Sequence, residues 1–380
     1  MRTMSKVLLG EIAIERKETC KGNKDGFPIV GLEHLIPEQV TLSDWDEDKI
    51  NTFTKLFSEG DVLFGRRRAY LKKAAVAPFD GICSGDITVI KAIPERILPE
   101  LLPFIIQNDS FFQYAVGKSA GSLSPRVKWE HLRNYEFELP NIEKQRELAR
   151  ILWAMEETKK SYQKLLQLSN ELVKSQFIDL FSLPGINKYG FTECKIKNVI
   201  IDLRYGTSKP ASEHGTYPYL RMNNITYDGK LDLSELKYID LSESELDKCM
   251  VRQGDVLFNR TNSRELVGKT CVFTEEKSMV IAGYIIRVRL NERVLPLYLS
   301  VMFNTDYGKA LLKKMAKGAI GQANINAQAL QNIDILLPPL LLQEQFAAFV
   351  RQSDKTKFEL EKTLVELTGT YKKLMSANFG

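Results

Sequence analysis

Two stretches of this chain, about 143–181 and 341–379, repeat apolar residues at alternating steps of four and three. An average step of about 3.5 residues is typical of a coiled-coil seam, on which two helices pack side by side. At ~1.5 Å per residue each helix would be roughly 55–60 Å long, which suits a spacer better than a core helix. The seam positions are Leu148, Leu152, Met155, Tyr162, Leu166, Val173 and Leu180 in the first stretch, and Phe346, Val350, Leu360, Leu364, Leu367, Tyr371 and Leu374 in the second. We expect two long helices packed on each other, each holding a globular module away from the other.

The two helical stretches belong to a longer duplication. The string Gly60–Phe64 (GDVLF) recurs as Gly254–Phe258, and Lys159 occupies the same seam slot as Lys357. A polar residue in a seam can set the register of two helices at some cost in stability. Further matches in the same order are Arg68 with Arg264, Lys73 with Lys269, Val76 with Val272, Gly85 with Gly283, Asp109 with Asp306, Leu139-Pro140 with Leu337-Pro338, and Gln145 with Gln343. Ordered matches along the whole chain indicate one duplicated half of about 190 residues.

The rest of each half reads as a strand-rich module. Apolar runs of strand length, such as GDVLF and DITVIKAI, are separated by glycine, proline and aspartate. We therefore predict an α+β protein, in which two mixed modules are joined by two long antiparallel helices with an internal pseudo-two-fold repeat. The predicted parts are residues 1–140 (module one), 141–181 (first long helix), 182–189 (linker), 190–338 (module two) and 339–380 (second long helix).

Composition and charge limit the functional classes. The chain has 53 Lys and Arg against 48 Asp and Glu, a net charge of +5, which permits a nucleic-acid partner without requiring one. No apolar run reaches the ~18–20 residues of a membrane span, and the N-terminus has no signal-peptide pattern. The five cysteines are scattered and form no CxxC. We expect a cytoplasmic protein without a membrane segment or a zinc site.

The strongest candidate binding stretch follows the first GDVLF strand. Five cations fall within Arg66–Lys73, and three adjacent arginines cannot all enter a core. The matching stretch of the second half is also rich in donors, and Arg and Asn read guanine and adenine through paired hydrogen bonds. A loop that grips DNA is the favoured interpretation, and a solvated turn is the alternative. The candidate residues are Arg66, Arg67, Arg68, Tyr70 and Lys73 in the first half, and Asn259, Arg260, Asn262, Arg264 and Lys269 in the second.

Two further sets of loops are candidates for phosphate or base contact, because they combine glycine with small polar and basic side chains. One set is the pair of glycine-containing loops Gly117–Lys128 and Lys317–Asn326, which could equally be flexible connections. The other is a basic turn with a following Asn pair, for which a plain hairpin remains open. The candidates are Lys118, Ser119, Ser122, Ser124, Arg126 and Lys128; Lys317, Gln322, Asn324 and Asn326; and Arg204, Tyr205, Lys209, Arg221, Asn223 and Asn224.

We find no pattern for catalysis or for a metal. Val267–Thr270 (VGKT) resembles the end of a phosphate-binding loop, but Ser263 stands where the first glycine is required. His34, His131 and His214 are isolated in the sequence, which favours surface or structural roles. Asp61 and Asp255 are shared by both halves, but a Gly-Asp pair before a strand is commonly structural. No catalytic residue and no metal ligand is predicted.

Taken in order, these features resemble the specificity subunit of type I restriction–modification systems. The resemblance rests on two modules that each contain Gly-Asp-Val-Leu-Phe, close with Leu-Pro-x4-Gln and lead into a long helix, and it covers nearly the full chain. It implies two target recognition domains, with the helices setting the spacing of a two-part site on double-stranded DNA. One departure is that Gly65 precedes Arg66 where Asn259 precedes Arg260, which fits two modules that read different half-sites.

The resemblance also implies partners and cofactors. The subunit itself would have no catalytic activity and no cofactor. Two modification subunits would use S-adenosylmethionine for DNA methylation, and restriction subunits would use ATP and magnesium. Three alternatives remain: a stand-alone two-domain DNA-binding protein, a coiled-coil scaffold that binds only protein, and a nuclease acting as a pseudodimer. The nuclease would need matching acidic residues in both halves, which the sequence does not offer.

Overall fold

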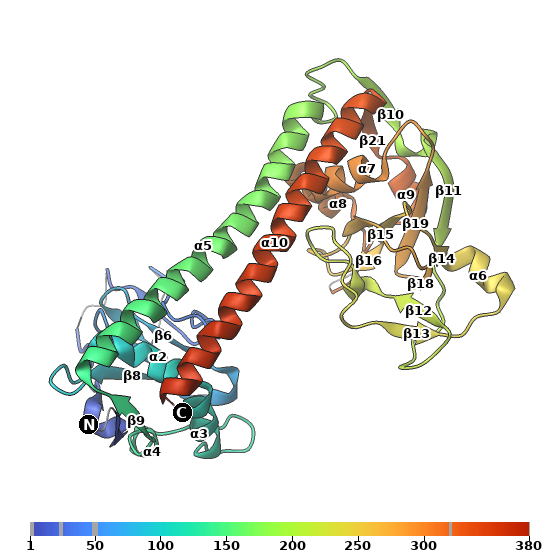
Figure 1. Ribbon diagram of the computed structural model, residues 1–380. Coiled ribbons are helices and arrows are strands. Elements are labelled where there is room, and N and C mark those ends of the chain that lie inside the picture. The colour runs from blue at the N-terminus through green and yellow to red at the C-terminus, as the bar shows by residue number, and fades with distance from the viewer. Residues whose placement is uncertain (1–3, 23–25, 48–51, 319–320, 380) are drawn as a thin grey trace. The chain divides into compact units, whose positions relative to one another are not determined.

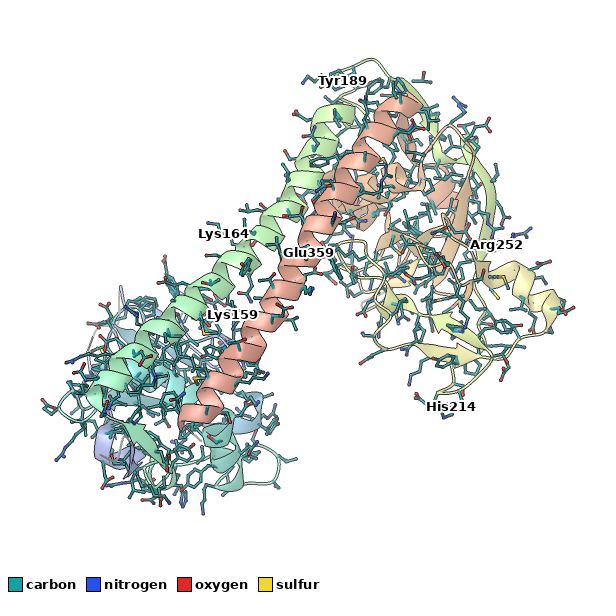
Figure 2. The ribbon with its side chains drawn as sticks, viewed as in Figure 1. Lys159, Lys164, Tyr189, His214, Arg252 and Glu359 are labelled. Atoms are coloured by element: carbon teal, nitrogen blue, oxygen red, sulfur yellow. The ribbon has the colours of Figure 1, made fainter. Side chains whose placement is uncertain are left out.

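The computed structural model describes residues 4–22, 26–47, 52–318 and 321–379 (Figure 1). The chain forms two compact units: unit 1 comprises residues 1–164 and 360–380, and unit 2 comprises residues 165–359. Both long helices cross from one unit to the other, α5 (Ile142–Phe181) after Lys164 and α10 (Leu340–Phe379) after Glu359 (Figure 2). Each unit therefore contains one strand-rich module and part of both helices.

Unit 1 alternates short strands and short helices before α5 begins. Its strands are β1 (Met4–Leu8), β2 (Ala13–Glu15), β3 (Ile29–Val30), β4 (Lys55–Phe57), β5 (Val62–Gly65), β6 (Ala74–Val76), β7 (Gly81–Cys83), β8 (Ile87–Ala92) and β9 (Glu136–Pro140). Its shorter helices are α1 (Leu9–Ile12), α2 (Leu102–Gln107), α3 (Asp109–Gly117), α4 (Trp129–Leu132) and the 3-10 turns η1 (Ala69–Leu71) and η2 (Pro99–Leu101).

Unit 2 has the same alternation after α5 ends. Its strands are β10 (Thr192–Lys195), β11 (Ile200–Tyr205), β12 (Tyr217–Leu220), β13 (Lys237–Ile239), β14 (Met250–Val251), β15 (Val256–Asn259), β16 (Thr261–Asn262), β17 (Thr270–Val272), β18 (Met279–Ile281), β19 (Ile285–Leu290), β20 (Ala323–Asn324) and β21 (Asp334–Leu337). Its shorter helices are α6 (Glu243–Cys249), α7 (Pro296–Asn304), α8 (Asp306–Met315), α9 (Ala327–Gln331) and the 3-10 turns η3 (Ile196–Asn198) and η4 (Met222–Asn224).

The two units share one plan of sheets. A four-stranded antiparallel sheet has the order β2-β8-β5-β6 in unit 1 and β11-β19-β15-β17 in unit 2. The repeated GDVLF strand occupies the same place in both: Val62 lies opposite Val76 and Ile90, and Val256 lies opposite Val272 and Val288. The protein is therefore of the α+β class, as the sequence predicts, with the duplicated strand inside each sheet.

A second sheet and a terminal ribbon repeat as well. The second sheet contains one parallel pair in each unit, β3 with β7 and β12 with β18. The ribbon pairs the first and last strands of each module, β1 with β9 and β10 with β21. It brings the chain back to the place from which a long helix starts.

The shared aspartates fix the turn that precedes the central strand. Gly60 and Gly254 have φ values of +84° and +90°, a left-handed conformation that glycine adopts without strain. A carboxylate oxygen of Asp61 accepts a hydrogen bond from the Ser58 amide at 2.8 Å, and Asp255 repeats this contact with Arg252, also at 2.8 Å. Both carboxylates are almost fully buried. This is the structural use that the Gly-Asp pair suggests.

Each long helix contributes apolar side chains to both units. In unit 1, Leu148 and Leu152 near the start of α5 share a core with Met375 and Phe379 at the end of α10. In unit 2, the end of α5 and the start of α10 share another core; their buried members are Val173, Phe177, Phe181, Phe346 and Val350. The remaining seam positions are half-buried: Met155, Tyr162, Leu166, Leu180, Leu360, Leu364, Leu367, Tyr371 and Leu374.

The end of α5 is fixed by the conformation of the residue that follows it. The helix ends at Phe181, because Ser182 already adopts a left-handed conformation with φ +61°. Its amide still donates to the Ile178 carbonyl at 2.9 Å. A left-handed residue just after a helix is a common terminator, and here a serine rather than a glycine adopts it.

A repeated glutamine ties each long helix to its module. The side-chain oxygen of Gln145 accepts from the Leu98 amide at 2.9 Å, while its nitrogen donates to the Pro140 carbonyl at 2.9 Å. Gln343 makes the same two contacts, with Leu295 and Pro338, at 2.9 Å each. Both side chains are buried, at 4% and 1% exposed. The Leu-Pro-x4-Gln pattern is therefore a local device that sets how the helix leaves its module.

Replacing Gln145 or Gln343 by alanine is expected to lower the free energy of unfolding of the altered chain by about 1–3 kcal/mol, because each leaves buried backbone groups without partners. The loss should be at least as large for Gln343, because its side-chain nitrogen also donates to the Arg293 carbonyl at 3.0 Å. Chemical denaturation measures both. Gln163→Ala, at an exposed position of α5, is the matched control. Equal stability of Gln145→Ala and this control would contradict the proposed role.

Within the described part of the chain, no helix has the combination of length and apolar character that crossing a membrane requires.

Candidate nucleic-acid interface

The arginine triplet of unit 1 lies against the glycine-containing loop 117–128. The Val127 amide donates to the Arg66 carbonyl at 3.0 Å, and the Arg68 amide donates to the Pro125 carbonyl at 2.8 Å. Arg67 and Arg126 form an antiparallel bridge between the two segments. Two stretches that are separate candidates in the sequence thus form one surface, which we call the triplet surface (residues 66–70 and 117–128).

The Asp86 side chain joins the two segments. Its carboxylate accepts from Arg126 Nε at 2.7 Å and pairs with Arg67 Nη1 at 3.5 Å, while Arg67 Nε donates to Ser124 Oγ at 2.9 Å. The hydrogen bond from Arg126 is the main reason that the pKa of Asp86 is lowered from its usual value, and burial opposes it. The same bond raises the pKa of Arg126. One carboxylate therefore orders two of the candidate arginines.

The anchor at Asp86 is expected to depend on pH. Because the folded pKa is lowered, the ion pairs stabilise the loop above the ordinary aspartate value of about 4, and this contribution disappears as pH falls through the folded value. Hydrogen exchange at the Ala120 and Arg126 amides should become faster in this acidic range, after correction for the intrinsic effect of pH on exchange rates. Asp86→Asn should show fast exchange at neutral pH as well. Asp80→Asn, in another loop of unit 1, is the control, and slow exchange in Asp86→Asn would refute the anchor.

The remaining candidates of unit 1 divide by exposure. Tyr70 is 55% exposed and lies two residues after Arg68, whose backbone is left-handed with φ +55°. Lys73 instead donates its ammonium group to the Leu32 carbonyl at 2.7 Å. The exposed candidates are Arg68, Tyr70, Lys118, Ser122, Arg126 and Lys128, and the half-buried ones are Arg66, Arg67, Lys73, Ser119 and Ser124.

Unit 2 brings its corresponding segments together in the same way. The Ile325 amide donates to the Arg260 carbonyl at 2.9 Å, which matches the bond between Val127 and Arg66. Strands β16 and β20 pair Thr261 with Asn324. The Arg260 guanidinium lies 4.8 Å from the ring centre of Tyr205. The stretch 204–209 therefore joins the stretches 259–264 and 317–326. We call these three stretches the unit 2 surface; residues 319 and 320 lie outside the described residues.

Three candidates of unit 2 are buried and have internal partners. Asn259 is 0% exposed, and its side-chain nitrogen donates to the Tyr284 carbonyl at 3.1 Å. Asn224, 2% exposed, accepts from the Arg221 amide at 2.9 Å. Lys269 is 7% exposed, its ammonium donates to the Met222 carbonyl at 2.7 Å, and burial lowers its pKa. In this structure all three side chains bond to groups inside the module, which favours an internal role over a DNA contact.

The other candidates of unit 2 lie at or near the surface. Some have charged neighbours: Lys209 pairs with Glu245 at 2.7 Å, and Arg204 pairs with Asp202 at 3.0 Å. The exposed candidates are Arg204, Tyr205, Lys209, Asn223, Arg264, Lys317, Gln322 and Asn326, and the half-buried ones are Arg221, Arg260, Asn262 and Asn324.

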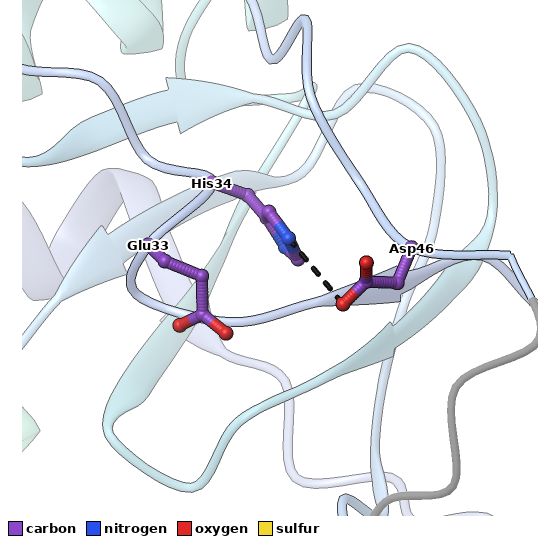
Figure 3. Close-up of side chains that lie close together, drawn as sticks. All are labelled: Glu33, His34 and Asp46. Carbon is purple, nitrogen blue, oxygen red and sulfur yellow. Dashed lines mark ion pairs between the residues drawn. The ribbon is translucent and has the colours of Figure 1, made fainter. Parts of the chain in front are cut away.

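One group in unit 1 has the composition of a metal site. Glu33, His34 and Asp46 offer ligand atoms within 4.8 Å of one another (Figure 3). However, His34 Nδ1 accepts from the Gly31 amide at 3.0 Å, and His34 Nε2 faces an Asp46 carboxylate oxygen at 3.6 Å. Both ring nitrogens are thus engaged in the loop's own structure. His214, in contrast, is exposed on unit 2 (Figure 2).

Sequence reasoning did not single out Asp86, although it orders the triplet surface. A signal was present: Asp86 follows Gly85, which is repeated as Gly283, whereas Tyr284 stands at the equivalent place in the second half. Because the residue after this repeated glycine differs between the two copies, the position could have been recognised as one that distinguishes the modules. The backbone contact persists, since the Arg66 amide donates to the Asp86 carbonyl at 3.0 Å and the Arg260 amide to the Tyr284 carbonyl at 2.9 Å.

A family model described as the type I restriction modification DNA specificity domain matches this chain twice, at residues 2–170 and 194–367. The two matches cover most of the chain, and the chain belongs to this family. The resemblance inferred from the repeated motifs is confirmed, and one match falls on each half of the predicted duplication.

Individual relatives agree with this assignment. The MjaX type I restriction enzyme specificity subunit of Methanocaldococcus jannaschii is 29% identical over 189 residues, which are 49% of this chain and 44% of that protein. The EcoKI specificity subunit of Escherichia coli is 28% identical over 166 residues, 43% of this chain and 36% of that protein. The matched region thus spans less than half the length of these curated relatives.

A solved structure supports the fold over the whole chain. A chain from a study of complex assembly and conformational transition in a type I restriction–modification system aligns with a TM-score of 0.59 and 21% identity. The alignment covers 99% of this chain and 97% of that one.

Proposed function

We propose that this chain is the DNA specificity subunit of a type I restriction–modification complex, with one recognition surface in each unit. The observation that carries the proposal is the repeated assembly of the two surfaces. In both units the segment after the GDVLF strand is joined by a backbone hydrogen bond to the loop before the last strand, Val127 to Arg66 and Ile325 to Arg260. Exposed arginine, lysine, tyrosine and amide side chains on these segments suit phosphate and base contacts.

We infer that α5 and α10 pair as an antiparallel coiled coil related by a pseudo-two-fold axis, which would act as a ruler between two half-sites. Support comes from within each unit, because opposite ends of the two helices contribute to the same core. The boundaries proposed for the recognition domains and spacers remain 1–140, 141–181, 190–338 and 339–380. Half-sites about one helical turn apart, roughly 34 Å, are typical of paired recognition modules.

One of the two seam lysines joins the long helices within unit 2. Lys357 is 5% exposed, and its ammonium lies 2.6 Å from an Asp354 carboxylate oxygen and 3.2 Å from Asn170 Oδ1. In unit 1 the Lys159 ammonium lies 3.6 Å from the buried carboxylate of Glu156, a neighbour on its own helix. The bond from Lys357 to Asn170 is the contact that joins α10 to α5, and a buried polar contact of this kind favours one alignment of two helices.

The helices also offer a surface for protein partners. Leu165, Leu168 and Leu172, at steps of three and four residues on α5, are 46–53% exposed. Such a stripe outside the seam suits a further helix from a modification or restriction subunit. We propose that S-adenosylmethionine, ATP and magnesium are bound by those partners, and that this chain supplies recognition without catalysis.

The test is to map methylated motifs in DNA from cells that carry this chain with its modification subunits. We expect one two-part motif that disappears when this chain is deleted. A gel-shift assay with duplexes that carry and lack the motif checks recognition directly. Methylation that does not depend on this chain would contradict the proposal. Assembly with partner subunits without any DNA binding would instead favour a scaffold that binds only protein.

A further inference from the structure

The triplet surface contains a short, well-anchored hairpin. The Ala120 and Arg126 backbones exchange two hydrogen bonds, of 3.0 and 2.9 Å, which close the hairpin at its base. Gly121 has φ +113° and allows the chain to turn, and the Pro125 carbonyl accepts from the Arg68 amide. The ion pair of Arg126 with Asp86 adds a side-chain anchor at the base. Residues 121–125 are therefore held as a defined tip.

The residue at this tip is apolar. Leu123 is 90% exposed, the largest fraction among the exposed large apolar side chains of the described residues. Serines flank it on both sides in the sequence, Ser122 and Ser124. Hydrophobic surface of this kind is unfavourable in water, and the hairpin's own anchors give it no cover. A fixed, uncovered leucine at the end of an anchored hairpin suits insertion into a partner.

The charge around the tip identifies the partner as a polyanion. Loop 117–128 carries Lys118, Arg126 and Lys128, all exposed, and has no acidic residue of its own. Arg68 adds a fourth exposed cation beside Pro125. Asp86 offsets only part of this charge, because Arg67 and Arg126 share it. A protein partner would need a contact area of roughly 800 Å² on each side, which one leucine in a basic loop does not supply.

We propose that Leu123 is a wedge that enters the base stack of the bound DNA, while the surrounding cations hold the phosphates. Apolar side chains that enter between base steps partly unstack and bend the duplex. This inference rests on the proposed DNA-binding function, and it adds that the first recognition surface deforms its half-site as well as reading it. The free energy of burying the leucine would offset part of the unstacking cost.

The test compares Leu123→Ala, Leu123→Ser and Leu123→Met in the full chain assembled with its modification subunits. The probe is a short duplex carrying the mapped motif, with 2-aminopurine at successive steps of the first half-site. We expect affinity for the motif to fall about 10-fold in the alanine and serine variants. The fluorescence increase that reports unstacking should disappear in them and persist with methionine. The dependence of affinity on salt should stay unchanged, because no charge is removed.

Controls separate this inference from the function on which it rests. Val116→Ala, another exposed apolar residue of unit 1, should bind like the unaltered chain. If the unaltered complex does not distinguish the motif from a scrambled duplex, the proposed function fails, and the wedge fails with it. If that complex binds and unstacks the motif but Leu123→Ser does so equally, only the wedge is refuted. Loss of subunit assembly with unchanged DNA binding would also refute the wedge and assign Leu123 to a protein contact.

Discussion

Removing residues 161–164 from α5 is expected to abolish methylation of the original motif. Under the proposed ruler role, four residues shorten one helix by about 6 Å, a little under two base pairs along the duplex. The deletion also rotates the following seam residues by about 40° around the helix axis, since four residues are slightly more than one turn. Recognition should disappear, or return at a motif with the same half-sites and an unread spacer changed by one or two base pairs.

Motif mapping by sequencing of methylated DNA measures this outcome. The matched control keeps the length of the helix and changes its surface: Ser161, Gln163 and Lys164, all exposed, are replaced together by alanine. This control should methylate the original motif. If the shortened helix also left the target sequence unchanged, the two helices could not be setting the distance between half-sites.

Replacing Arg66, Arg67 and Arg68 together by alanine is expected to weaken DNA binding about 100- to 1,000-fold at 0.1 M salt. Each phosphate contact that is lost lowers the slope of log affinity against log salt by about 0.9, so three contacts account for nearly three decades between 1 and 0.1 M. Arg68 is exposed, whereas Arg67 shares Asp86 with Arg126, so part of the loss would come through a loosened hairpin. Gel shifts over a range of salt concentrations give both quantities.

The control removes the same charge from another part of unit 1. Lys17, Lys91 and Arg96 are exposed cations outside the triplet surface, and replacing all three by alanine should change the slope little. An unchanged salt dependence in the arginine triplet variant would show that the triplet is a solvated turn, which was the alternative in the sequence. Equal losses of DNA affinity in the arginine triplet variant and in this control would indicate a general effect of net charge.

Most of the architecture was predictable because local sequence patterns, namely apolar runs, helical periodicity and turn residues, determine the strands and the long helices. The GDVLF strings become the inner strands β5 and β15, and the runs DITVIKAI and YIIRVRL become their partners β8 and β19. The helices α5 and α10 lie where the apolar repeats at about 143–181 and 341–379 indicate them. Period and turn residues act over a few positions, so they can be read without a structure.

The candidate site was predictable only as a set of segments. The sequence indicated the segments after each GDVLF strand and the glycine-containing loops, but it could not show that Val127 and Arg66 bond to each other. It also could not separate Lys269, which is buried against the Met222 carbonyl, from the exposed Arg264 a few residues before it. The candidate list as a whole stays a prediction until DNA binding is measured.

The sequence by itself determined that the protein is a duplication, where its long helices run and which family it resembles, because repeats and periodicity are properties of residue order. The tertiary structure decided which polar side chains face outward and which are used internally. The side chains of Asn224, Asn259 and Lys269 point inward because they form hydrogen bonds with backbone amide or carbonyl groups inside the module. Asp86 binds two arginines because the fold brings residues 40 positions apart into contact. No local pattern in the sequence indicates this contact.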